Sequence, residues 1–406
     1  MKSVLRSTMM GLLGMAALVM TAGSPAQAAF VVGGENGWQM TYDGMINVFM
    51  VYTTKSNQAA DDQRQSFRIR TGLLPSIFAF NVKSPTINGV DYAARIGLYP
   101  QVQNSGTRTG LGPGTGNDLE NGGTSIDVRE VFFTADGKFG QFLVGRALNL
   151  YQGKNILTDM TLIGNGVPLN MTGGGVDLGH IGYGYTYAAF GPQFRYTTPD
   201  MSGFKVAFAI CDPSKIGGST TVENATVINQ PRFETELSYV RKIGEVNLNT
   251  WLGGLYQEAS FNSRAKKVNS IGGAMGIQAT MGPFEALLSG WGGEGIGMGL
   301  TQDDGEALDA FGEERVAFGG LAHATYQLGK AKIGLQYGIN YQYETENDDR
   351  LVDQVTKSKQ ALTAGVYYSL NKYLTLVGEY TRAENRYYNG YKETMNVFSA
   401  GTVFTW

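Results

Sequence analysis

The chain has 406 residues, of which 57 are glycine, 22 tyrosine and 20 phenylalanine, while only 17% are charged. The formal net charge of −3 argues against nucleic acid as a partner, and the single cysteine, Cys211, excludes an intrachain disulfide framework. No cluster of histidine, cysteine and carboxylate residues has metal-site spacing, so the sequence predicts neither a metal nor another cofactor. His180 and His323 have no nucleophile at a recognisable spacing, and the sequence therefore indicates no catalytic residue.

The N-terminus predicts a secretory signal peptide at 1–28. Two basic residues precede an apolar run at 9–21, and Ala26-Gln27-Ala28 places small residues at the spacing of a cleavage site. A membrane-anchor helix is the alternative, but such a helix needs about 20 apolar residues. We therefore expect an exported protein whose folded domain is 29–406.

Apolar and polar residues alternate with period two through most of this domain. The segment 331–344 shows it most clearly, because Ile333, Leu335 and Tyr337 alternate with polar residues such as Gln336. In an outer-membrane barrel the apolar face contacts lipid and the polar face lines a lumen. In a soluble sandwich the apolar face would form a core, and periodicity alone does not separate the two. The predicted strands are 38–53, 64–83, 90–102, 125–134, 139–148, 189–197, 204–211, 232–242, 245–257, 269–280, 283–291, 315–328, 331–344, 359–369, 373–386 and 395–406.

The number of strands depends on the segment 64–83, which contains Pro75. Proline cannot donate to a central β-ladder, so either one long strand bulges at Leu74-Pro75 or the chain makes a hairpin turn there. The bulge gives sixteen strands and the turn gives seventeen. Single-chain bacterial barrels have an even number of strands, which favours the bulge.

The connections between the predicted strands alternate in length. Short turns such as 136–138 and 281–282 alternate with longer polar segments such as 104–124 and 294–313. Short turns at one side of the membrane and long loops at the other are typical of outer-membrane proteins. The sequence therefore predicts an all-β fold, a transmembrane antiparallel β-barrel of sixteen strands surrounded by outer-membrane lipid.

Several short motifs resemble those of the Gram-negative general porins. They are Arg129-Glu130-Val131-Phe132-Phe133, Phe139-Gly140 with Gly145-Arg146, the hairpin from Tyr196-Thr197-Thr198-Pro199 to Gly203-Phe204, and the terminal Val403-Phe404-Thr405-Trp406. The resemblance implies a homotrimeric channel whose third external loop folds into the lumen, and a C-terminal strand that the barrel-assembly machinery recognises. The segments 73–76 and 158–162 depart from the family pattern, which points to a divergent, substrate-preferring subgroup.

The predicted strand at 139–148 is followed by a loop at 149–180, which we call the constriction loop. Leu157, Met160 and Leu162 make it too apolar for a solvated linker, so we expect it to pack on the inner wall and narrow the lumen. Asp159 and Asp177 are its candidate pore-facing acids. Each could instead cap the loop locally by accepting hydrogen bonds from backbone N–H groups, and both interpretations stay open.

A set of arginines on adjacent strands is the candidate basic wall of the pore. On the strand at 125–134 we expect Asp127 and Arg129 to face inward and Phe132 outward. Parity would place Arg146 on the lipid face, where a charge is costly, but the resemblance implies that this residue points inward after a local irregularity. The five candidates are Arg68, Arg70, Arg95, Arg129 and Arg146.

These arginines have two interpretations. Rings of arginine or lysine favour anions, which would give the pore a preference for small anions. Structural ion pairs with Asp127 and with the loop acids would instead neutralise the arginines. Other inward positions could extend or oppose the basic wall: Arg195, Arg232 and Arg315 on one side of the balance, and Glu234, Glu236 and Glu285 on the other.

The sequence thus predicts an outer-membrane channel for the passive diffusion of small hydrophilic solutes and ions, with some anion preference. Two other functional classes remain open: an outer-membrane barrel enzyme, and a structural or adhesive barrel with a closed lumen. Conductance across a lipid bilayer separates the channel from the closed barrel. An assay after mutation of His180 and His323 addresses the enzyme.

Overall fold

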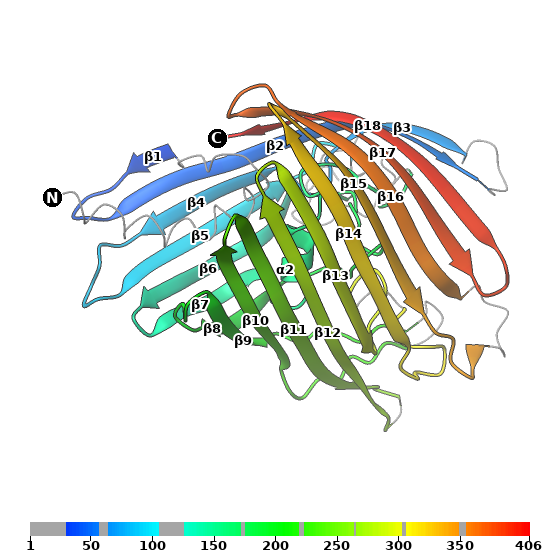
Figure 1. Cartoon of the computed structure of the whole chain (residues 1–406). Coiled ribbons are helices and arrows are strands. Elements are labelled where there is room, and N and C mark those ends of the chain that lie inside the picture. Colours follow the sequence, from blue (N-terminus) through cyan, green and yellow to red (C-terminus); the bar gives the residue numbers. More distant parts are fainter. Residues whose placement is uncertain are drawn as a thin grey trace.

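The computed structural model describes residues 30–56, 64–104, 126–171, 175–218, 223–263, 265–302, 306–348 and 355–406. The predicted signal peptide at 1–28 lies outside these residues. In the described chain, antiparallel strands form one sheet that closes into a barrel, with a short helix inside it (Figure 1). None of the helical residues in these ranges forms a helix long and apolar enough to span a membrane.

The strand segments follow one another around the barrel in chain order. They are β1 (Phe30–Gly33), β2 (Gln39–Lys55), β3 (Gln65–Arg70), β4 (Ile77–Lys83), β5 (Asp91–Pro100), β6 (Ile126–Gly137), β7 (Gly140–Leu148), β8 (Phe190–Thr197), β9 (Phe204–Cys211), β10 (Arg232–Ile243), β11 (Val246–Ser260), β12 (Lys267–Met281), β13 (Phe284–Glu294), β14 (Val316–Leu328), β15 (Ala331–Gln342), β16 (Thr356–Ser369), β17 (Leu374–Tyr387) and β18 (Lys392–Thr405).

The barrel closes where the last strand meets the first long one. β18 pairs with β2 from Met395↔Lys55 to Thr405↔Met45. β3 and β4 both pair with β2, one after the other, and so act as a single interrupted strand. β1 pairs with β2 beyond the end of β18. With β1 outside the ring and β3 and β4 counted together, the barrel has sixteen strands, and the predicted fold class is confirmed.

Between β3 and β4 the chain leaves the sheet without changing its direction. Residues 71–76, which we call the inward bulge, stand opposite only residues 46–48 of β2. Asn47 holds the inward bulge, because its Nδ2 donates to the carbonyl of Leu74 at 2.7 Å and its Oδ1 accepts from the N–H of Gly72 at 2.8 Å. The prediction of one strand interrupted near Pro75 is confirmed, and a hairpin turn at this position is wrong.

The outer face of the barrel is apolar and the inner face polar. On β15, Ile333, Leu335 and Tyr337 are 43%, 53% and 43% exposed, whereas Gln336 and Asn340 are 0% exposed. This arrangement inverts that of a soluble protein and is the one expected when lipid surrounds the barrel.

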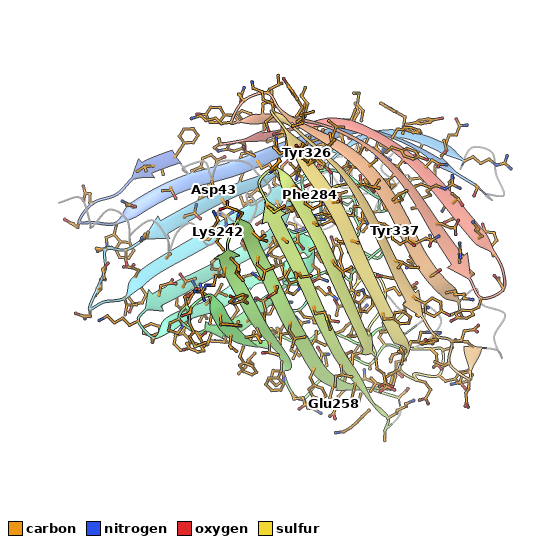
Figure 2. All side chains as sticks on the ribbon, in the orientation of Figure 1. Asp43, Lys242, Glu258, Phe284, Tyr326 and Tyr337 are labelled. Carbon is orange, nitrogen blue, oxygen red and sulfur yellow. The ribbon has the colours of Figure 1, made fainter. Side chains whose placement is uncertain are left out.

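The outward aromatic side chains include a pair close to the short turns. Phe284 and Tyr326 lie opposite each other on β13 and β14 at that end of the barrel. Glu258 lies at the other end of the strands (Figure 2). Amphipathic aromatic rings near the ends of the apolar belt are typical of the membrane interface.

The orientation of one side chain differs from the prediction. Phe132 is 7% exposed and faces the interior, while Val131 and Phe133 are 43% and 48% exposed. The pairing of β5 with β6 shifts after Gly97, so that Arg129 is an extra residue in the ladder. Because a β-bulge changes which residues face inward, the alternation counted from the start of this strand does not extend to Phe132.

The described residues between β7 and β8, 149–171 and 175–189, lie inside the barrel, so the constriction loop extends beyond its predicted end at 180. It contains the helix α2 (Gly153–Leu157), which is enclosed by the strands in Figure 1. The prediction that this loop packs on the inner wall is confirmed. The packed residues are Tyr151, Ile156, Leu162, Ile181 and Tyr185 of the loop and Trp251, Leu255, Trp291 and Leu321 of the wall.

We predict that Leu335→Arg destabilises the barrel by about 2–4 kcal/mol, the cost of arginine on the lipid face near the bilayer midplane. Leu335 is 53% exposed in the middle of β15. Urea-induced unfolding in phospholipid vesicles measures the change. The matched control is Leu328→Arg beside a short turn, where about 0–1 kcal/mol is expected. Equal losses at both positions would contradict a lipid-facing outer surface.

Candidate functional site

A cavity of about 660 Å³, which we call the lumen cavity, lies between the constriction loop and the barrel wall. The loop side includes Leu150, Lys154, Leu157 and Thr158, and the wall side extends from β4 to β13. This cavity is the candidate pore site, because the docked loop leaves this space in the lumen. Its charged lining residues are Arg95, Glu130, Lys154, Arg195, Glu236 and Glu285.

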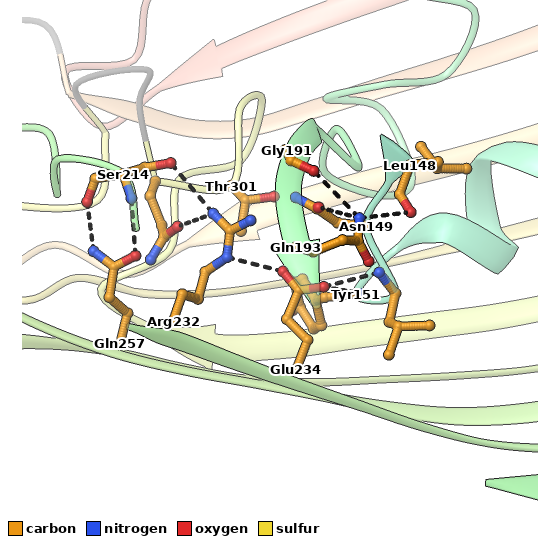
Figure 3. Close-up of polar contacts among 12 residues, drawn as sticks. Leu148, Asn149, Tyr151, Gly191, Gln193, Ser214, Arg232, Glu234, Gln257 and Thr301 are labelled. Atoms are coloured by element: carbon orange, nitrogen blue, oxygen red, sulfur yellow. Dashed lines mark hydrogen bonds and ion pairs between the residues drawn. The ribbon is translucent and has the colours of Figure 1, made fainter. Parts of the chain in front are cut away.

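Glu234 of β10 anchors the beginning of the constriction loop. Its Oε2 accepts hydrogen bonds from the N–H groups of Leu150 at 2.8 Å and Tyr151 at 3.0 Å (Figure 3). Its Oε1 pairs with Nε of Arg232 at 2.9 Å. Glu234 is 2% exposed, and a buried N–H left without a partner would cost about 1–3 kcal/mol. One carboxylate therefore satisfies two loop amides and one buried cation.

Arg232 connects this anchor to the external loops. Its Nη1 donates to Oγ of Ser214 and to Oε1 of Gln302, each at 3.2 Å. Gln257 of β11 binds the backbone of Ser214 through both ends of its amide (Figure 3). The root of the constriction loop and the external end of the barrel thus belong to one buried polar network.

The middle of the loop is held through Asp159. Nε2 of Gln336 donates to Oδ1 of Asp159 at 2.6 Å, while Oε1 of the same amide accepts from the N–H of Met160 at 2.8 Å. The hydroxyl of Tyr185 donates to Oδ2 of Asp159 at 2.7 Å. Burial alone would raise the pKa of Asp159, but His180 and the hydrogen bonds outweigh it and hold this pKa below its ordinary value.

Close approach of the loop to β15 requires a glycine on the wall. A Cβ atom at Gly338 would lie 1.9 Å from the carbonyl oxygen of Tyr183. Next to it, Oδ1 of Asn340 accepts from the N–H of Gly184 at 3.1 Å, and its Nδ2 donates to the carbonyl of Tyr185 at 3.2 Å. The inner face of β15 therefore gives the backbone of residues 183–185 both the space at Gly338 and the hydrogen-bond partner at Asn340 that it needs.

Glu379 of β17 forms the third attachment. Its Oε2 accepts from the N–H groups of Asn165 at 2.8 Å and Gly166 at 2.9 Å, and its Oε1 accepts from the hydroxyl of Tyr367 at 2.6 Å. Glu379 is 6% exposed. Like Glu234, it satisfies two consecutive amides of the loop.

Arg70 and Asp177 attach the end of the loop to β3. Nη2 of Arg70 lies 2.9 Å from Oδ1 of Asp177 and donates to the carbonyl of Gly175, while Nη1 donates to the carbonyl of Asn170. Both charged side chains are buried, at 1% and 0% exposure. Burial raises the pKa of Asp177 to about 6, against the opposing effect of Arg70. The inward bulge adds two backbone hydrogen bonds, Leu73 N–H to Gly164 and Asp177 N–H to Gly72.

The candidate arginines do not form one continuous wall. Arg70 contacts the loop, and Arg68 lies half-buried on the same face of β3. Arg95 lines the lumen cavity with ion pairs to Asp43 at 2.9 Å and Glu130 at 2.7 Å.

The other two candidates lie outside the cavity lining. Arg129 pairs with Asp127 at 2.8 Å and lies over the ring of Tyr99. Arg146 follows Gly145, whose φ is 127°, pairs with Val131 in the sheet and donates to the carbonyl of Phe190 at 2.6 Å. The loop acids Asp159 and Asp177 are also absent from the described lining of the cavity.

Sequence reasoning did not identify Lys154, which lies in α2 and faces the lumen cavity. A single helical turn within an irregular loop leaves no periodicity to read. The wall surface on which the loop packs is recognisable in the sequence, because Trp251 and Trp291 occupy inward positions where polar residues are expected. No group of three or more potential metal ligands occurs among the residues whose positions are described.

Comparison with known proteins identifies one family and several solved structures of similar fold. A model described as Gram-negative porin matches residues 14–387. The outer membrane channel DcaP of Acinetobacter baumannii has a TM-score of 0.68 at 14% identity, covering 94% of this chain and 100% of that chain. The anion-selective porin from Comamonas acidovorans has a TM-score of 0.61 at 14% identity, covering 91% of this chain and 100% of that chain.

A trimer form of OmpT from Vibrio cholerae has a TM-score of 0.54 at 13% identity, covering 91% of this chain and 100% of that chain. No curated protein sequence matches. At these identities the structural similarity shows a shared fold.

We predict that Glu379→Gln loosens the constriction loop. Hydrogen bonds to a charged acceptor are worth about 1.5–3 kcal/mol, so the amides of Asn165 and Gly166 should exchange roughly tenfold to a hundredfold faster. Hydrogen exchange read by mass spectrometry measures this. The matched control is Glu384→Gln on the same strand, which pairs with Arg386 and Lys392 instead of the loop. Equal exchange rates in the two variants would refute this anchoring role.

We predict that acidification from pH 7 to 5 keeps the loop docked. Because docking raises the pKa of Asp177 from 3.8 to about 6, proton uptake stabilises the docked loop as the pH falls through 6. The pKa shift of Asp159 has the opposite sign. The stabilisation of the docked loop by its carboxylate is therefore complete above about pH 4 and is lost only at lower pH.

Carboxyl carbon NMR of detergent-solubilised protein measures both titrations. Asp177→Asn should remove the step near pH 6 and leave the Asp159 signal in place. A midpoint for Asp177 at or below the ordinary value would show that Arg70 outweighs burial and would contradict the prediction.

Proposed function

The chain belongs to the Gram-negative porin family, and from this premise we propose that it forms a water-filled channel for passive diffusion of small hydrophilic solutes and ions. The family and the fold support an outer-membrane channel and point away from an enzyme. The observation that carries the proposal is the lumen cavity, with charged groups on both the loop and the wall. Sixteen strands enclose an aqueous space, and the docked loop narrows it without filling it.

The proposal includes a weak preference for small anions. Arg95 and Glu130 in the cavity neutralise each other. Lys154 and Arg195 also line the cavity and form no ion pair within the described chain. The same holds for Glu236, while Glu285 contacts the imidazole of His323, which balances its charge only when protonated. The preference is expected from Lys154 and Arg195, and the carboxylates of Glu236 and Glu285 keep it weak. The fold of the Comamonas anion-selective porin supports this reading.

The basic wall predicted from sequence has a divided role in this proposal. Arg95 borders the passage, while Arg68 and Arg70 support the loop from β3 together with Asp177. Arg129 and Arg146 brace the wall near the root of the loop through Asp127 and Phe190, and Asp159 holds the loop in its middle.

The proposal also covers export, membrane insertion and oligomeric state. The chain is exported through the signal peptide at 1–28, is inserted with recognition of its C-terminal strand by the barrel-assembly machinery, and assembles as a homotrimer. Support for the trimer comes from the trimer form of the OmpT fold. Support for recognition of the C-terminus comes from the aromatic residues Phe404 and Trp406.

We predict that Lys154→Gln and Arg195→Gln each lower the chloride-to-potassium permeability ratio, and that Glu236→Gln raises it. The expected change is about two- to threefold, as for a partly screened charge worth a few tenths of a kcal/mol. Reversal potentials in planar bilayers under a KCl gradient measure the ratio. Lys138→Gln removes an exposed charge from a short turn and serves as the control.

A barrel that inserts into the bilayer and carries no current would contradict the channel and favour a closed structural barrel. Cation selectivity unaffected by the variants at Lys154 and Arg195 would contradict the anion preference alone.

A further inference from the structure

The charged residues of the lumen cavity divide into a paired and an unpaired group. Arg95 and Glu130 form an ion pair at 2.7 Å, and Glu285 contacts Nε2 of His323 at 3.3 Å. Lys154, Arg195 and Glu236 form no ion pair with any described residue. Charges in a narrow, partly apolar space are normally paired, because desolvation is costly. These three are therefore available to a ligand.

The three unpaired side chains surround one part of the cavity. Lys154 lies in α2, Arg195 on β8 and Glu236 on β10, and both cations interact electrostatically with the Glu236 carboxylate. Only β9 separates the two strands, and Arg195 and Glu236 pair with β9 residues two positions apart, which corresponds to about 12 Å between their backbones.

The strand between these residues leaves room for a ligand. Arg195 pairs with Ala209, and Glu236 pairs with Ala207. Both alanines are buried, at 0% and 5% exposure, and face the interior. A methyl group is too short to fill the gap between a guanidinium and a carboxylate. A space with opposite charges on its two sides therefore remains.

Arg195 is only weakly held by the protein. Its Nη1 donates to the carbonyl of Leu148 at 3.4 Å, and its Nε is buried with no hydrogen-bond partner in the described part of the chain. A guanidinium binds a carboxylate strongly through two parallel hydrogen bonds, and none of the described residues occupies that role here. The side chain can therefore turn toward a ligand carboxylate.

Apolar side chains complete the surroundings. Leu148, Leu157 and Phe190 line the same cavity, from β7, α2 and β8. Inorganic ions gain nothing from such a surface, whereas an organic ligand with an apolar portion does. A simple organic anion would also leave the carboxylate of Glu236 without a partner. A ligand that fits all three features carries a carboxylate, a cationic group and an apolar part.

We propose that the lumen cavity contains a binding subsite for zwitterionic amino acids with an apolar side chain. The ligand carboxylate binds Arg195 and Lys154, its ammonium group binds Glu236, and its side chain packs against Leu148, Leu157 and Phe190. The subsite rests on the channel function proposed above, because it describes which solutes the channel prefers.

The test compares L-phenylalanine with 3-phenylpropionate, which lacks the ammonium group, and 2-phenylethylamine, which lacks the carboxylate. Binding to the detergent-solubilised full chain is measured by isothermal titration calorimetry. We expect L-phenylalanine to bind about tenfold more tightly than either analogue, since each analogue leaves one charged group without a partner.

Three variants assign the contacts. Glu236→Gln should abolish the preference over 3-phenylpropionate, and Arg195→Gln the preference over 2-phenylethylamine. Arg195→Lys, which keeps the charge, should retain most of the latter preference, and Lys138→Gln should match the unmodified chain. Retained barrel structure is checked by heat-modifiable migration on SDS gels, and a variant that fails this check is replaced by Lys154→Gln, for which weaker binding of both carboxylates is expected.

Equal binding of the three ligands, or no binding, would overturn the subsite even if the channel conducts KCl normally. A barrel that binds L-phenylalanine selectively but carries no KCl current would support the subsite and contradict the channel. The two proposals therefore fail in distinguishable ways.

Discussion

The interior of the barrel depends on wall carboxylates that accept backbone N–H groups of the constriction loop. Glu234 and Glu379 each bind two consecutive loop amides, and both are almost completely buried. A segment that leaves the sheet loses its ladder partners, and its buried amides need others. Without these two side chains the loop would have to remain hydrated, and the space that it now leaves open would have no fixed shape.

The same requirement accounts for the position of the loop acids. Asp159 and Asp177 lie in the loop but are 4% and 0% exposed. Asp159 attaches the loop to β15 by accepting a hydrogen bond from Gln336, and Asp177 attaches it to β3 through its ion pair with Arg70. The charges left to face the passage come from elsewhere, in particular from Lys154, Arg195 and Glu236. The charges that hold the loop and the unpaired charges that line the lumen cavity are thus different residues.

Much of the fold could be predicted from the sequence because lipid and water place opposite demands on alternate residues. The alternation at 331–344 identifies both faces of β15. The even number of strands in bacterial barrels identifies a single strand around Pro75. The orientation of Phe132 could not be predicted, because the β-bulge at Arg129 has no recognisable pattern in the sequence. Parity identified Arg70 and Arg95 as inward residues, but their partners Asp177 and Asp43 come from distant segments that only the fold brings together.

The attachments of the constriction loop have a consequence for the order of events in assembly. Glu379 lies on β17 and Arg70 on β3, and the seam between β18 and β2 separates them. In a sheet that has not yet closed, these two residues stand near opposite edges, and the loop can reach one of them at a time. Only closure of the seam allows both contacts. The full set of loop contacts can therefore form only once the ring is complete, so the aperture takes its final shape no earlier than the closure of the wall.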